Sequence, residues 1–124
     1  MMYRAFQRRF MRELALAALV VAMAACGGSS STGVGSCGQS GANANVNATD
    51  SKVFSPNGTT ITHGQSVCWQ NNGTLTHSVT ADNGTSFNGT IGPGQTFVQA
   101  FPTAGAFPYH CIYHTGMTGT VTVN

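Results

Sequence analysis

Three residues near the C-terminal end of the chain carry side chains that bind soft metal ions. Cys111, His114 and Met117 follow one another at intervals of three residues. Thiolate and thioether favour Cu(I), whereas imidazole binds both oxidation states of copper. A second imidazole would complete a trigonal site of two histidines and one cysteine with a weak axial methionine, the geometry of electron-transfer copper centres. His77, thirty-four residues before Cys111, is the best candidate for that imidazole.

Each of these residues also has a simpler interpretation. His77 could be a hydrogen-bonded interior histidine, Cys111 a buried and unreactive thiol, and Met117 a filler of the core. Their joint spacing, together with the Val-rich strand that follows, favours copper. Two other histidines are weaker candidates, because His110 falls on the opposite face of its predicted strand from Cys111 and His63 falls in a predicted turn.

The elements that position these side chains are predicted to be β-strands. Helix formers are scarce, and Val, Thr and Phe alternate with polar residues between turn motifs. Asn-Gly pairs at 57–58, 72–73, 83–84 and 88–89, and Gly-Pro-Gly at 92–94, predict turns. The predicted strands are 44–54, 59–61, 66–71, 76–81, 87–91, 95–101, 105–111 and 119–123. Short strands at this spacing favour an all-β sandwich in one small domain.

Strand alternation predicts where the candidate ligands point. His77 shares a strand face with Leu75 and Val79, and an apolar face is expected to lie against the core. Cys111 shares its face with Tyr109. We therefore expect His77 to point inward near one end of the sandwich, with the loop after Cys111 folding back toward its sulfur.

The 111–117 loop resembles the ligand loop of the cupredoxins, the small blue copper proteins. Its Cys-x2-His-x2-Met pattern is similar to the short loop of amicyanin and pseudoazurin, and Gly-Thr-Val-Thr-Val follows at 119–123. Phe54-Ser55-Pro56, the stretch 64–71 and Thr76-His77-Ser78-Val79 stand upstream in the order a cupredoxin shows. The resemblance covers roughly residues 42–124. It implies a Greek-key β-sandwich with one type 1 copper, whose ligands are His77, Cys111, His114 and Met117.

The resemblance also implies roles for residues around the copper. Ser78 takes the position whose backbone N–H donates to the cysteine sulfur, and many relatives have Asn there, so the side-chain hydrogen bonding must differ. The ring edge of His114 is expected to emerge through an apolar patch that docks redox partner proteins. The candidates for this patch are Pro93, Ile112, Tyr113 and Met117. These features imply an electron carrier and not an enzyme; the alternative is an exported chaperone or buffer that delivers copper to another protein.

The first 25 residues are predicted to be a secretory signal peptide. Four arginines are followed by an uncharged apolar run at 14–25. Ala24-Ala25-Cys26 resembles a bacterial lipobox, although Met23 stands where Leu is usual, and this resemblance implies cleavage before Cys26 and its acylation. The alternative is an ordinary signal peptide cut nearby.

The predicted mature chain is organised as a tether and a domain. Residues 26–41 are rich in Gly and Ser and are predicted to be a flexible, lipid-anchored tether. Residues 42–124 would form the copper-binding domain, a monomer held at the periplasmic face of a bacterial membrane or at the cell surface.

Charge is nearly absent after the predicted signal peptide. Lys52, Asp50 and Asp82 are the only residues of charged type from Cys26 onward, which gives one cation minus two anions, or −1 with His neutral. A nucleic-acid partner is excluded, because it requires clustered Lys or Arg. Strong electrostatic steering of a protein partner is not expected either.

Two cysteines, Cys37 and Cys68, remain once Cys26 and Cys111 are assigned. An exported protein meets an oxidising compartment, which favours a disulfide between them. Cys68 lies between Val67 and Trp69, so it faces outward if those two face the core. The alternative is that both thiols are free, with Cys37 in the tether.

Overall fold

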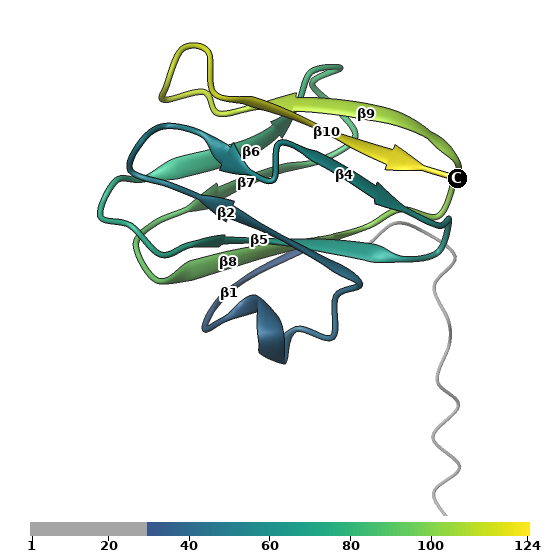
Figure 1. The fold of residues 1–124 in the computed structure, drawn as a ribbon, viewed down its shortest axis with the longest axis horizontal. Coiled ribbons are helices and arrows are strands. Elements are labelled where there is room, and N and C mark those ends of the chain that lie inside the picture. The colour runs from purple at the N-terminus through teal and green to yellow at the C-terminus, as the bar shows by residue number, and fades with distance from the viewer. Residues whose placement is uncertain (1–29) are drawn as a thin grey trace, which may run out of the picture.

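Two β-sheets packed face to face make up the part of the chain that the structure describes, residues 30–124 of a computed structural model (Figure 1). The predicted signal peptide and Cys26 lie outside these residues. The first sheet has the order β1 (Ser30–Val34), β8 (Gln95–Ala100), β5 (Ser66–Asn71), β2 (Ala44–Ala48) and β3 (Phe54–Ser55). The second has the order β4 (Gly58–Ile61), β10 (Thr118–Val123), β9 (Gly105–His110), β6 (His77–Ala81) and β7 (Asn88–Ile91). The prediction of an all-β sandwich is confirmed.

Both sheets are mixed. β2 pairs with β5 in parallel, and β10 pairs with β4 in parallel, while the other pairs are antiparallel. A short 3-10 helix, η1 (Cys37–Gln39), links β1 to β2. Among residues 30–124, no helix is long and apolar enough to cross a membrane.

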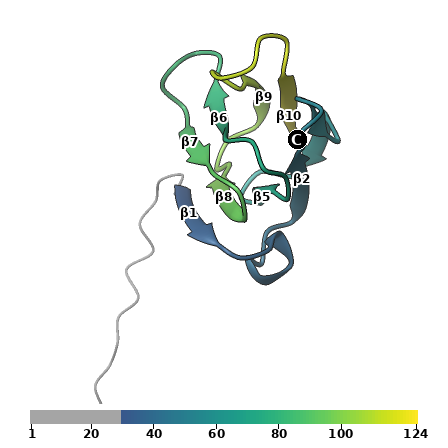
Figure 2. The ribbon, with the colours of Figure 1, turned by 90° about the vertical axis from the view of Figure 1, so that its left-hand side faces the viewer.

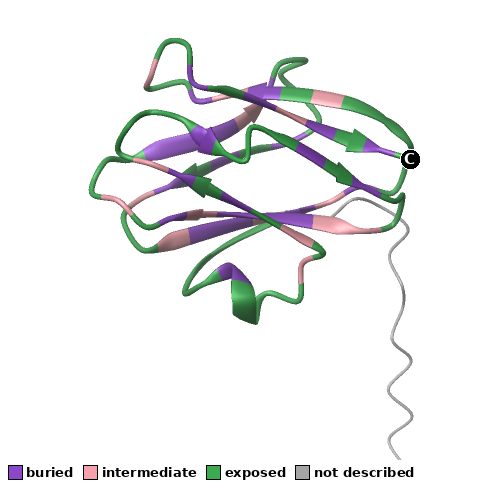
Figure 3. Cartoon of the chain, in the orientation of Figure 1, coloured by how far each residue is buried: buried purple, intermediate pink, exposed green. Residues whose placement is uncertain are grey.

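The core lies between the two sheets and is rich in aromatic side chains. Trp69 on β5 is fully buried, and its ring centroid lies 5.3 Å from that of Tyr109 on β9 and 5.9 Å from that of Phe97 on β8. Figure 3 shows that buried residues are concentrated on the strands, whereas the connecting loops are mostly exposed. This packing follows from alternation, because every second side chain of a strand faces the opposite sheet.

Most predicted strands are present within one or two residues of the expected bounds. The predicted strand 44–54 instead divides into β2 and β3, because a turn in which the Lys52 N–H donates to the Thr49 carbonyl separates them. The turn predicted at Asn88-Gly89 is wrong, since both residues lie inside β7. Gly89 is needed there for a different reason: a Cβ at this position would overlap the Phe97 ring.

The prediction that residues 30–41 belong to a flexible tether is wrong. β1 pairs with the edge of β8, as Figure 2 shows, and a disulfide then joins Cys37 to Cys68 on β5. All five residues of β1 are exposed. An edge strand of this kind is held by backbone hydrogen bonds, which a Gly- and Ser-rich composition does not reveal. The ordered fold therefore begins before residue 42.

Candidate metal centre

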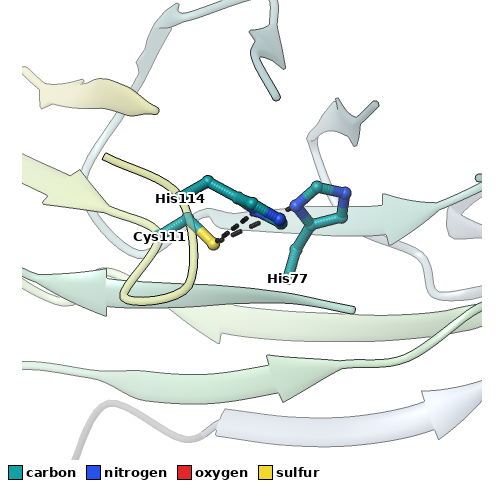
Figure 4. A group of neighbouring side chains, drawn as sticks. All are labelled: His77, Cys111 and His114. Carbon is teal, nitrogen blue, oxygen red and sulfur yellow. Dashed lines mark hydrogen bonds between the residues drawn. The ribbon is translucent and has the colours of Figure 1, made fainter. Parts of the chain in front are cut away.

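Three metal-binding side chains converge at one end of the sandwich. One ligand atom from each of His77, Cys111 and His114 lies within 4.8 Å of the others. His77 is the first residue of β6, and the other two belong to the loop between β9 and β10. Figure 4 shows both imidazoles beside the cysteine sulfur, with Nδ1 of His114 at 3.5 Å and Nδ1 of His77 at 4.0 Å from Sγ. In Figure 1 this loop lies at the end opposite the C-terminus.

The loop after β9 is folded by its own backbone. The Cys111 N–H donates to the Met117 carbonyl at 2.9 Å, and the Met117 N–H donates to the His114 carbonyl at 3.2 Å. Gly116 adopts a left-handed φ of 84°, which a glycine reaches without strain. The three-residue spacing therefore closes the loop on itself and brings His114 back over Cys111.

Met117 is buried, with 1% of its surface exposed, and packs in the core cluster that also contains Cys111. The prediction that Met117 belongs to the exposed patch is therefore wrong.

Leu75 also differs from its prediction. It is 36% exposed, although strand alternation placed it on the core face. The reason is that β6 begins only at His77, so Leu75 lies in the preceding loop where alternation does not apply.

The other two histidines of the domain lie apart from this group. The side chain of His110 pairs with Asp82, with 2.6 Å between Nδ1 and Oδ1. His63 is exposed in the turn between β4 and β5. Neither belongs to the cluster, as strand alternation and turn placement indicated.

Ser78 connects β6 to the ligand loop twice. Its backbone N–H donates to the Cys111 sulfur at 3.3 Å, and its Oγ accepts the Ile112 N–H at 2.9 Å. Ser78 Oγ also lies 3.0 Å from Thr80 Oγ1, which donates to Asn88 Oδ1 at 3.0 Å. Because the single hydroxyl proton of Thr80 is used on Asn88, Ser78 donates to Thr80. The result is a continuous relay of hydrogen bonds from the ligand loop to β7.

His77 is fully buried, and its environment favours the neutral imidazole. Burial lowers its pKa, nearby His114 lowers it further, and the Asp50 carboxylate opposes both effects. A metal binds the neutral ring, so a lowered pKa leaves His77 ready to act as a ligand. Among the described residues its Nε2 has no hydrogen-bond partner.

Asp50 is a part of this end of the fold that the sequence analysis did not single out. Its carboxylate accepts the backbone N–H of Thr74 at 2.8 Å and that of Leu75 at 3.1 Å, and it also accepts the Thr74 hydroxyl. These hydrogen bonds lower the pKa of Asp50, with the Leu75 bond the largest cause. Its presence in a domain with almost no charge was the available hint.

Asn71 joins two loops at the same end. Its side-chain amide donates to the carbonyls of Leu75 and Ile91, and its backbone carbonyl accepts the Gly94 N–H. The residue is fully buried. The loops before and after the β6–β7 hairpin are thereby held together beside the metal-binding group.

We expect the metal-free chain to lose stability as the pH falls below about 6.5, the ordinary pKa of histidine. The folded pKa of His77 is lowered, so the unfolded chain takes up a proton first and stability declines with acidification. Asp50 adds a second loss below its ordinary pKa of 3.8, because its folded pKa is also lowered. Urea denaturation at a series of pH values measures this. A His77→Gln variant should lack the upper decline, and an unchanged decline in that variant would contradict the assignment.

Comparison with known proteins identifies the family. Residues 42–124 match the model of the copper binding proteins of the plastocyanin/azurin family. The chain belongs to the cupredoxins. A plastocyanin from Scenedesmus fuscus is 33% identical, over 57% of this cupredoxin and 86% of the plastocyanin.

Solved structures agree with this assignment. A purple cupredoxin from Nitrosopumilus maritimus is 25% identical and aligns with a TM-score of 0.61, over 66% of this cupredoxin and all of that chain (100%). The oxidized state of an amicyanin mutant aligns with a TM-score of 0.69 at 22% identity, over 78% of this cupredoxin and 98% of that chain, and this likeness concerns the fold alone.

The donor set of this cupredoxin fits copper. Two imidazole Nδ1 atoms and one cysteine sulfur converge, and the buried Met117, which carries a thioether, closes the same loop. That combination of two histidines and a cysteine with an axial methionine is typical of one type 1 copper. Copper is therefore the cofactor, and electron transfer with redox partners is the general activity of the family.

Proposed function

We propose that this cupredoxin is a one-electron carrier between redox proteins at the cell envelope, with His77, Cys111, His114 and Met117 as the copper ligands. The observation that carries the proposal is the convergence of two imidazole Nδ1 atoms on a buried cysteine sulfur that already accepts a backbone hydrogen bond. Copper held there would accept and return one electron by cycling between Cu(II) and Cu(I).

Each side chain has a separate task in this proposal. His77 and His114 would hold the copper through their imidazoles, and the Met117 thioether would be a weaker ligand that tunes the potential. Cys111 supplies the thiolate. The Ser78 N–H donates to the Cys111 sulfur and withdraws electron density from it, which favours Cu(I) and raises the potential.

Electrons would enter and leave beside His114. This side chain is only partly buried, and the two residues before it, Ile112 and Tyr113, are 57% and 51% exposed. Pro93 is exposed in the β7–β8 loop. Exposed apolar side chains on an almost uncharged domain suit a small, transient contact, and weak redox encounters bury less than about 1,200 Å2 in total.

The proposed location is the periplasmic face of a bacterial membrane or the cell surface. The basic and apolar composition of residues 1–25 supports export, and the lipobox-like Ala24-Ala25-Cys26 supports acylation at Cys26. The Cys37–Cys68 disulfide is consistent with an oxidising compartment. A monomer anchored in this way would meet its partners at the membrane surface.

The decisive experiment is visible absorption and EPR of the domain loaded with Cu(II), beside a Cys111→Ala variant. We expect an intense thiolate-to-copper band and a small parallel hyperfine splitting, both lost in the variant. A pale spectrum that the variant leaves unchanged would contradict electron transfer. Copper exchange is measured on the same samples, because the buried His77 and Cys111 predict slow exchange and rapid exchange would favour copper delivery.

A further inference from the structure

A carboxylate from another loop holds the chain that enters β6. Asp50 follows β2, and its two oxygens accept hydrogen bonds from two successive backbone N–H groups and one hydroxyl, all within residues 74–75. Hydrogen bonds to an ionised acceptor are about twice as strong as neutral ones. Asp50 therefore ties residues 74–75, just before His77 in the second sheet, to the loop that follows β2 of the first sheet.

The fit between Asp50 and this loop is close. A Cβ at Gly73 would overlap the Asp50 carboxylate. The carboxylate can therefore come close to the backbone only because residue 73 is a glycine. Asn71 holds the same loop from the other side through the Leu75 carbonyl at 2.6 Å. Leu75 is thus bound at both its N–H and its carbonyl, two residues before the ligand.

The negative charge of Asp50 also acts on the predicted copper ligand His77. Its carboxylate acts on His77 electrostatically, and only two other residues of charged type, Lys52 and Asp82, occur from Cys26 onward. Asp82 is paired with His110. Because so few other charged side chains occur, the exposed Asp50 carboxylate beside residues 74–75 is an acidic group that acts on His77, against the effects of burial and of His114.

We infer that Asp50 is a positioning and potential-setting residue of the copper centre, which holds the 73–75 loop so that His77 meets Cys111 and stabilises Cu(II) over Cu(I) through its negative charge. This inference rests on the proposed copper function. No proton or electron moves through Asp50, so its effect is on the placement of His77 and on the balance between the two oxidation states.

Asp50→Asn tests the inference, because it keeps the shape of the side chain and removes the charge. The ratio of Cu(II) to Cu(I) affinity is expected to fall about threefold to tenfold, and a tenfold fall is a rise of about 59 mV in the one-electron potential. Asp82→Asn is the matched control, since it removes the same charge from a residue that pairs with His110, outside the group of His77, Cys111 and His114. Its potential should stay close to that of the original protein.

A measurement without copper tests the positioning role separately. In the copper-free protein, the amide protons of Thr74 and Leu75 should exchange with solvent about tenfold faster in Asp50→Asn. The remaining neutral Oδ1 is a weaker acceptor than a carboxylate oxygen, and an NH2 group in place of Oδ2 cannot accept from Thr74. The exchange rates of these two amide protons should be unchanged in Asp82→Asn.

The outcomes separate this inference from the proposed function. A normal thiolate-to-copper band with equal potentials and equal exchange in Asp50→Asn would overturn the role of Asp50 and leave the carrier function standing. If the potential rises equally in Asp50→Asn and Asp82→Asn, the effect comes from the net charge of the protein, and the specific role of Asp50 is overturned. If the original protein gives no such band, the carrier function fails, the potential-setting role fails with it, and the amide exchange still decides the positioning role.

Discussion

Replacing Cys37 and Cys68 together by alanine is expected to lower the free energy of unfolding by about 3–4 kcal/mol. This is the loss that the chain-entropy model gives for a bridge between residues 31 apart in sequence. Both cysteines are almost fully buried, with 2% and 0% of their surfaces exposed, so alanine is preferable to a buried serine hydroxyl. Urea denaturation of the copper-free protein measures the change without a contribution from metal binding.

The copper centre provides an internal control for this prediction. The disulfide lies on β5 in the first sheet, whereas His77 and Cys111 belong to the second sheet and its loop. The thiolate-to-copper band of the double variant should therefore match that of the original protein. A loss of stability below about 1 kcal/mol would show that β1 and η1 are held by backbone pairing alone and that the bridge adds little.

The cluster of His77, Cys111 and His114 and the strands around it were predictable from the sequence because both depend on local patterns. Alternation placed His77 inward and His110 outward, and three-residue spacing brought Cys111, His114 and Met117 into one loop. These rules operate over a few residues and need no knowledge of how the sheets pack.

The features that the sequence analysis missed or misplaced depend on contacts between distant segments. The pairing of β1 with β8 leaves no apolar pattern in the sequence. Gly89 makes room for the Phe97 ring across the core and does not form a turn. Asp50 was counted as a charge, but its role arises from backbone groups 24 and 25 residues further along the chain. Such contacts become visible only when the loops are placed beside one another.

The same distinction governs Ser78, whose position suggested a backbone contact but not what its side chain would do. Its hydroxyl takes part in a chain of hydrogen bonds that runs from Ile112 through Thr80 to Asn88. Because these hydrogen bonds join the 111–117 loop to β6 and β7, they restrain the loop that carries Cys111 and His114. The backbone bond to the Cys111 sulfur is a separate interaction that a change of side chain leaves in place.

We expect Ser78→Ala to weaken copper binding by about 10–100-fold, the usual effect of removing a group that orients metal ligands. The Ile112 N–H loses its acceptor, and because Ile112 is 57% exposed and water can replace the hydroxyl, the loss in folding free energy is about 0.5–1.5 kcal/mol. Competition with a chelator measures the affinity, and the thiolate-to-copper band should persist because the Ser78 N–H is retained.

Thr80→Val is the matched control for this prediction. It removes the next hydroxyl in the relay but leaves the bond between Ser78 Oγ and the Ile112 N–H intact. Its copper affinity should fall much less than that of Ser78→Ala. If both variants bind copper as tightly as the original protein, the loop is held by its own backbone turns and by Met117 in the core, and the relay contributes only to the packing of β6 against β7.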